Sequence, residues 1–246
     1  MAGVSVWAAA GTGAEYSGKW KYNRRGMLIA ALDTTTSRGS VALWREGDVV
    51  AELRLRSEAS HSTQLLPGLE SLLRALGAGP DAVDGYAVTT GPGSFTGLRV
   101  GLATVQGLAL ARSRPCVGLS ALDVLAVRIR GAAVCLVSVM DAFRGELYYR
   151  VYDGEGRPLG EPGLASPEAI AGSLDGEVAF AGDGLAAQGG ALRGLLPGAV
   201  FPERSLFLAG TLARLAGPML ERAEGTPASA LRPLYIRPPT IRKAGG

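Results

Sequence analysis

The polar residues best placed for chemistry follow the first strongly apolar segment of the chain. The segment DTTTSRGS begins there and supplies Asp33, Thr34, Thr35 and Ser37 together with a glycine. Such a turn can bind a phosphate through hydroxyl and backbone N–H groups, while its carboxylate holds Mg²⁺ through water. The same side chains can instead satisfy the backbone of a tight hairpin without any ligand. Composition leaves both interpretations open.

A second turn, GPGSFTGLR, lies between an expected strand and an expected helix. Free N–H groups and the positive end of the helix dipole would face whatever lies in front of it. The turn matches neither G-x-G-x-x-G nor a P-loop, and close approach of strand and helix explains its glycines equally well. With the Asp33 turn, Gly91 and Gly93 form a candidate site for weak binding of ATP or ADP with Mg²⁺. We expect no required cofactor.

The single histidine, His61, limits the catalytic sites that the chain could form. It excludes any metal motif that needs two histidines of one chain, and no G-x-S-x-G elbow accompanies it for a hydrolase. A histidine at the start of a helix more often caps or packs. We therefore predict neither a catalytic residue nor a metal site.

Carboxylates also occur in two later turns. The segment MDAFRGELYY contains Asp141, Arg144 and Glu146, and a close carboxylate pair could serve as acid and base. Solvated hairpin charges are the commoner outcome of such a pattern. Asp183 lies in a Gly-Asp-Gly sequence that is too short to interpret by itself.

The charge of the chain argues against a protein that binds nucleic acid on its own. The formal net charge is +3, and residues 1–26 account for it, with four basic residues against one acidic. Neutralising phosphates supplies most nucleic-acid affinity, yet the remaining chain is neutral apart from a short basic tail. Cys116 and Cys135 lack metal-ligand spacing, so we expect reduced core residues. No segment approaches the roughly 18 apolar residues of a membrane span, which predicts a soluble protein.

The hydrophobic pattern predicts two related α/β halves. Residues 1–26 are expected to be a disordered extension, with a transit peptide as the weaker alternative. A three-stranded meander, a leucine-rich helix and a strand–turn–helix unit follow in residues 27–125. The same order of strand, Asp-containing turn, strand and later Gly-Ala helix restarts in residues 126–231. Two prolines should keep the tail, residues 232–246, extended.

Six segments together carry a resemblance to a known family. They are, in order, ALDTTTSRGSVALW, HSTQLLPGLESLL, TTGPGSFTGLRVGLATVQGLALA, DAFRGELYY, AGDG and PLYIR. Their order and spacing resemble the bacterial TsaB (YeaZ-like) family from Met27 to about Lys243. The stretch GPGSFTGLRVGLATVQGLA is specific for that family, whereas the Asp-Thr turn is shared by many actin-like and sugar-kinase-like ATPases.

The resemblance implies an actin-like (ASKHA) α/β fold of duplicated subdomains, each a mixed β-sheet flanked by helices. It implies a cytoplasmic, non-catalytic partner of TsaD, which transfers threonylcarbamoyl to N6 of adenosine 37 in tRNAs reading codons that begin with A. The ATPase TsaE completes the assembly, and tRNA is reached only through the complex. A homodimer is expected when the partner is absent.

The resemblance also places the partner interface on the two helices of the first half, which would form a bundle with equivalent helices of the sister or of a second copy. A stripe of small residues lets another helix approach closely. The same residues could instead face the protein's own core. The predicted interface residues are His61, Leu65, Leu69, Leu72, Gly97, Leu98, Gly101, Thr104 and Leu108.

An independent enzyme is the alternative function. A kinase of the actin-like class would need a general-base aspartate, and Asp141 and Asp183 are the available candidates. A glycoprotease-like hydrolase would have to use His61. The turn after Asp141 also departs from the family pattern, because Phe143 separates Ala142 from the basic residue.

Overall fold

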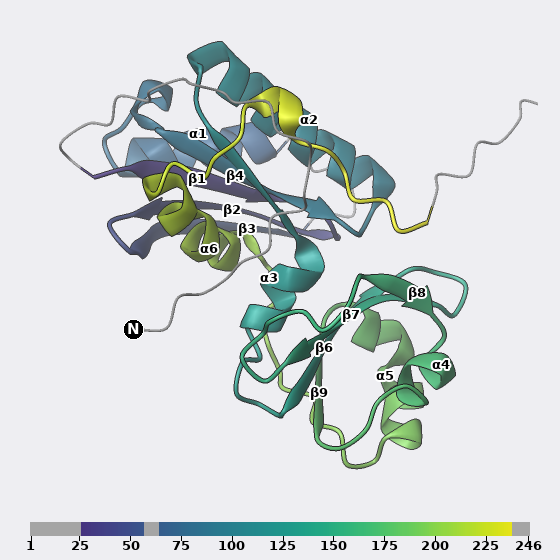
Figure 1. Cartoon of the computed structure of the whole chain (residues 1–246). Coiled ribbons are helices and arrows are strands. Elements are labelled where there is room, and N and C mark those ends of the chain that lie inside the picture. Colours follow the sequence, from purple (N-terminus) through teal and green to yellow (C-terminus); the bar gives the residue numbers. More distant parts are fainter. Residues whose placement is uncertain (1–25, 57–63, 238–246) are drawn as a thin grey trace, which may run out of the picture.

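The computed structural model describes residues 26–56 and 64–237, which form two units, each around one mixed β-sheet (Figure 1). The first sheet has the strand order β3-β2-β1-β4-β5. Its strands are β1 (Leu28–Asp33), β2 (Arg38–Arg45), β3 (Asp48–Arg56), β4 (Gly85–Gly91) and β5 (Cys116–Ser120). The predicted meander is confirmed, since β1 to β3 pair antiparallel. Strands β4 and β5 extend the sheet in parallel.

Strand β1 is buried on both faces, as its uninterrupted apolar sequence predicts. Leu28 and Leu32 pack with two helices on one face, whereas Ile29 and Ala31 pack with a third helix on the other. The helices are α1 (Leu65–Ala75) and α2 (Phe95–Arg112) on the first face and α6 (Ala209–Glu221) on the second. The sheet is therefore the middle layer of three.

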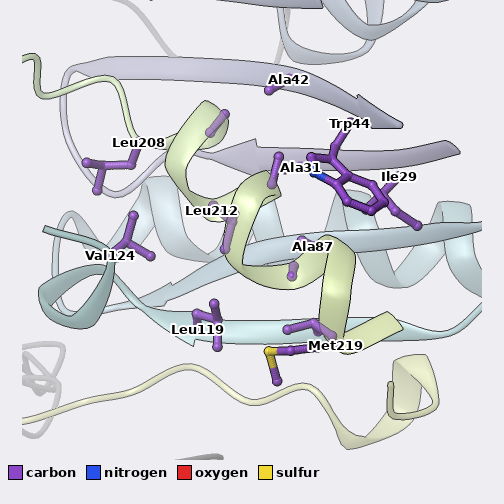
Figure 2. Close-up of a cluster of buried hydrophobic side chains, with 14 of the residues drawn as sticks. Ile29, Ala31, Ala42, Trp44, Ala87, Leu119, Val124, Leu208, Leu212 and Met219 are labelled. Atoms are coloured by element: carbon purple, nitrogen blue, oxygen red, sulfur yellow. The ribbon is translucent and has the colours of Figure 1, made fainter. Parts of the chain in front are cut away.

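Helix α6 corrects the predicted boundary of the second unit. Residues 126–231 were expected to fold together, but α6 packs against β1 and β2 of the first sheet. Figure 2 shows Leu212 and Met219 of this helix among side chains of the sheet. Gly217 allows the contact, because a Cβ there would lie 2.5 Å from the ring of Trp44. An amphipathic helix pattern does not specify which of two sheets the helix will cover.

The second sheet repeats the central order of the first in a shorter form, β8-β7-β6-β9. Strand β6 pairs antiparallel with β7 and parallel with β9, as β1 does with β2 and β4. The elements are β6 (Cys135–Asp141), β7 (Leu147–Asp153), β8 (Gly163–Ala165), α4 (Pro167–Ala171), β9 (Val178–Ala181) and α5 (Gly184–Leu195). The predicted duplication of mixed sheets flanked by helices is confirmed.

Three segments connect the units. Helix α3 (Ala121–Val127) carries Asp123, which accepts hydrogen bonds from Tyr152 Oη at 2.7 Å and Arg150 Nη1 at 2.9 Å. Arg128 reaches the chain segment before α6 by donating to the carbonyl of Phe207 at 2.8 Å. The short helices η2 (Pro80–Ala82) and η3 (Ala228–Ala230) complete the described elements. Within the described ranges, no helix is long and apolar enough to cross a membrane.

The third connection is the C-terminal segment 231–237, which we call the strap. It follows η3 without regular secondary structure and runs beside α2 towards the second unit (Figure 1). Leu234 N–H donates to the carbonyl of Thr90 at 2.7 Å. Arg237 donates to the carbonyl of Ala142 at 3.1 Å and pairs with Glu146 in the β6–β7 turn. Residues 1–25 of the extension predicted at 1–26, and residues 238–246 of the tail, lie outside the described residues.

Candidate functional site

The Asp33 carboxylate ends β1 and is fully buried. Its Oδ1 atom accepts hydrogen bonds from Thr35 N–H at 3.2 Å, Thr35 Oγ1 at 2.7 Å and Thr89 Oγ1 at 2.6 Å. Thr89 belongs to the neighbouring strand β4. The carboxylate thus joins the end of β1, the following turn and β4.

The turn after Asp33 packs directly on the start of α2. Ser94 N–H donates to the carbonyl of Thr35 at 2.7 Å, and Thr34 Oγ1 donates to the carbonyl of Gly97 at 2.7 Å. A Cβ on Gly97 would lie 2.1 Å from the carbonyl oxygen of Thr34, and a Cβ on Gly101 would lie 2.3 Å from Thr34 Oγ1. These glycines allow the turn and the helix to touch.

The predicted nucleotide-binding residues are therefore brought together, but most are enclosed. Thr34 and Thr35 are 1% exposed, and Ser37 alone of the six has an exposed side chain. Gly93 has φ +150°, and a Cβ there would lie 2.3 Å from the carbonyl oxygen of Thr35. Two hydrogen bonds join the turn to the N-terminus of α2. This arrangement agrees with the structural explanation of both turns.

A carboxylate of the second unit, Asp183, is close enough to Asp141 and Asp33 to be repelled by both. Burial raises the pKa of Asp183 to about 6, with added repulsion from Asp141 and Asp33. Asp183 precedes α5, and Gly182 lets its turn reach β6, because a Cβ there would lie 1.7 Å from the Val139 oxygen. Asp183 thus interacts with two aspartates that are far from it in the sequence. Among the described residues, no group of three His, Cys, Asp or Glu side chains could hold a metal ion.

The two carboxylates of the β6–β7 turn, for which an acid–base role was only the less expected outcome, have separate partners. Glu146 pairs with Arg237 of the strap, and Asp141 Oδ1 accepts a hydrogen bond from Phe143 N–H at 2.8 Å. Phe143 and Arg144 both have positive φ, 59° and 58°. Both of these side chains are exposed at the tip of the turn.

Most of the residues predicted for the partner interface are enclosed within the chain itself. Leu65, Leu69 and Leu98 are at most 4% exposed, because the sheet beneath the helices takes up this part of their apolar surface. Gly97 and Gly101 face the Thr34 turn. The predicted residues that remain partly accessible are Leu72, Thr104 and Leu108, and His61 lies outside the described residues.

A different side of α2 faces outward. Ala103, Gly107 and Leu110 are exposed, Leu110 to 76%, and a Cβ on Gly107 would meet nothing within 4 Å. Their spacing of four and three residues places them on one side of the helix. We call these three residues the outer face of α2. The sequence shows this spacing, but it shows a similar spacing for Gly97 and Gly101, which face inward. The spacing alone therefore does not indicate which side is exposed.

The two mixed sheets with their flanking helices define an actin-like α/β fold. One structure with this fold is the activator of 2-hydroxyisocaproyl-CoA dehydratase from Clostridium difficile with bound ADPNP. It matches with a TM-score of 0.50 at 13% identity, over 80% of this chain and 97% of that chain. This likeness concerns the fold alone.

Closer relatives define the family. A family model described as TsaD, tRNA N6-adenosine threonylcarbamoyltransferase, matches residues 50–197, more than half of the chain. YeaZ from Pseudomonas aeruginosa is 34% identical with a TM-score of 0.70, covering 85% of this chain and 99% of that chain. The chain belongs to the TsaB (YeaZ) family, within the wider group that the TsaD model describes.

Curated relatives match over a shorter stretch. The tRNA threonylcarbamoyladenosine biosynthesis protein TsaB of Escherichia coli K12 is 37% identical over 128 residues, 51% of this chain and 55% of that protein. The tRNA N6-adenosine threonylcarbamoyltransferase of Anaeromyxobacter dehalogenans strain 2CP-1 is 42% identical over 79 residues, 32% of this chain and 23% of that protein. The chain thus spans about half the length of the first curated relatives it matches.

Proposed function

We propose that this chain is a cytoplasmic, non-catalytic partner subunit in the formation of N6-threonylcarbamoyladenosine at position 37 of tRNA. Its membership of the TsaB family supports the pathway. The observation that carries the non-catalytic role is the closed contact between the Asp33 turn and α2. The Thr34 hydroxyl bonds the Gly97 carbonyl of α2 and the Thr35 hydroxyl bonds Asp33, so two side chains that could have bound a phosphate are engaged within the protein.

The proposed partner is a TsaD-type transferase, with a TsaE-type ATPase completing the assembly and tRNA bound through the complex. The chain itself resembles transferase sequences, so a heterodimer could pair equivalent surfaces around a pseudo-two-fold axis. The same surface would form an isologous homodimer when the partner is absent. The outer face of α2 suits this role, because Ala103 and Gly107 let a second helix approach closely.

Substitution of Gly107 by arginine tests the docking surface. Gly107→Arg should prevent both the heterodimer and the homodimer, since a long charged side chain would separate the helices. Gly190→Arg on α5 is the matched control, because Gly190 is also a helical glycine with nothing within 4 Å of its Cβ position. Light scattering after size-exclusion chromatography measures assembly, and circular dichroism measures folding. A Gly107→Arg chain that still binds the partner would exclude this face.

The non-catalytic role has a separate test. Purified chain alone should transfer no threonylcarbamoyl group to tRNA, whereas the mixture with the TsaD-type and TsaE-type proteins should do so. Transfer by the single chain would refute the proposal.

An independent kinase or ATPase is the second candidate, and the convergence of Asp33, Asp141 and Asp183 favours it. Hydrolysis of ATP by the isolated chain, lost in Asp183→Asn, would support this alternative. We place it second because the hydroxyl groups of Thr34 and Thr35 are already engaged within the protein.

A further inference from the structure

The exposed aromatic side chains of the described residues are concentrated around the strap. Phe95 is 40% exposed, Tyr235 is 36% exposed and Phe143 is 70% exposed. Every other aromatic residue in the described ranges is buried or partly buried. A cluster of exposed aromatic rings indicates a binding surface, because apolar rings are otherwise buried in the protein core.

Two of these rings form one stack with an arginine. The ring centroids of Phe95 and Tyr235 lie 5.6 Å apart at an interplanar angle of 33°. The Arg99 guanidinium lies 3.9 Å from the Phe95 centroid, and Arg99 Nε donates to Tyr235 Oη at 3.4 Å. These contacts join the first turn of α2 to the strap.

The third ring lies where the strap meets the second unit. Arg237 is two residues beyond Tyr235, a chain length of about 7 Å at most. It donates to the carbonyl of Ala142, the residue before Phe143. The strap thus contacts Phe95 directly and reaches the residue before Phe143 through the Arg237 side chain, and we call Phe95, Arg99, Phe143, Arg144 and Tyr235 the aromatic strip.

The charge beside these rings is positive. Arg99 and Arg144 are exposed, whereas both acids of the same turn are engaged, Glu146 with Arg237 and Asp141 with the N–H of Phe143. Flat rings with guanidinium groups match the two parts of an unpaired nucleotide, its base and its phosphate.

We propose that the aromatic strip binds unpaired nucleotides of the tRNA, with bases stacked on the rings and phosphates paired with Arg99 and Arg144. The identification of this RNA as tRNA rests on the function proposed above. The preference for single-stranded RNA is inferred from the residues of the strip alone. A protein partner could also use aromatic residues and arginine. A protein partner is less suited to the strip, because the strip lacks exposed aliphatic residues such as Leu110 of the outer face of α2. Leu110 lies 15 residues from Phe95, about 22 Å along the helix, so the two surfaces are separate.

The test uses the complex with the TsaD-type and TsaE-type proteins, a tRNA substrate, and the variants Phe143→Ala and Tyr235→Ala. Each variant should weaken tRNA binding in fluorescence anisotropy by roughly tenfold, as expected for loss of one stacked base. The KM for tRNA should rise while assembly stays intact, and Phe143→Tyr should retain affinity. Leu159→Ala is the control, since Leu159 is 65% exposed and lies outside the strip.

Two results would overturn the inference and are distinct from failure of the proposed function. Unchanged tRNA affinity in an active complex would refute the strip while the function stands. Loss of partner binding with unchanged tRNA affinity would make the strip a protein-docking surface. If no active complex forms, the isolated chain is titrated with a single-stranded RNA 12-mer. Weaker binding by Phe143→Ala and Tyr235→Ala then supports the strip, and equal binding refutes it.

Discussion

A methyl group at Gly97 should destabilise the protein strongly, although alanine is normally the better helix former. The new Cβ would lie 2.1 Å from the carbonyl oxygen of Thr34. That oxygen belongs to backbone and cannot rotate away like a side chain. The turn would have to retreat from α2 and give up two hydrogen bonds, from Thr34 Oγ1 to the Gly97 carbonyl and from Ser94 N–H to the Thr35 carbonyl.

The magnitude follows from these contacts. Overpacking costs about 1–3 kcal/mol, and each lost buried hydrogen bond costs about 1 kcal/mol more. Replacing a helical glycine by alanine returns up to about 1 kcal/mol. We therefore expect Gly97→Ala to lower the free energy of unfolding by about 2–4 kcal/mol.

Urea unfolding at low protein concentration measures this difference, with Gly107→Ala as the matched control. Both glycines lie on α2, but a Cβ on Gly107 would meet nothing within 4 Å, so its substitution should stabilise by up to about 1 kcal/mol. The two variants should change stability in opposite directions. If Gly97→Ala is neutral or stabilising, the contact between the turn and the helix is not a constraint, and the argument for a closed turn fails.

Two further predictions concern ionisable groups. The folded pKa of Asp183, about 6, lies above the ordinary 3.8, so the folded state binds this proton more tightly and the free energy of unfolding falls as pH rises through that interval. Asp183→Asn should flatten this decrease and stabilise the protein at pH 7.5 by up to about 3 kcal/mol; urea midpoints at pH 4.5 and 7.5 that move equally would contradict this. Burial raises the pKa of the Cys116 thiol to about 12, so this thiol should react with Ellman's reagent only on unfolding; rapid modification of Cys116 in the native protein, followed in Cys135→Ser, would show that it is accessible.

Local patterns predicted much of the fold. The apolar run of β1 and the alternation of the next two strands indicated the meander, and the repeated strand and Asp-turn order indicated the duplication. These features depend on neighbouring residues, whose burial and turn chemistry a single sequence displays. The placement of α6 depends on a contact between distant segments, and its sequence contains no information on which sheet it covers.

The candidate site could be predicted only in part for the same reason. The Asp33 turn was identified, but its partner Thr89 is 56 positions away and is an ordinary strand residue in the sequence. Likewise, the pairing of Glu146 with Arg237 joins positions 91 apart. Nothing near Glu146 indicated that its counterion would come from the strap rather than from Arg144.

Helix α2 shows why a pattern of small residues cannot by itself identify a docking surface. Gly97 and Gly101 face the Asp33 turn, while Gly107, six residues beyond Gly101, lies about 120° away around the helix axis. Both sides carry small residues at helical spacing, so the pattern alone cannot tell a buried side from a docking side. The contacts separate them, because a Cβ on Gly97 or Gly101 would meet Thr34, whereas one on Gly107 would meet nothing within 4 Å. A substitution at Gly101 would therefore report on folding, and only a substitution on the outer face can report on a partner.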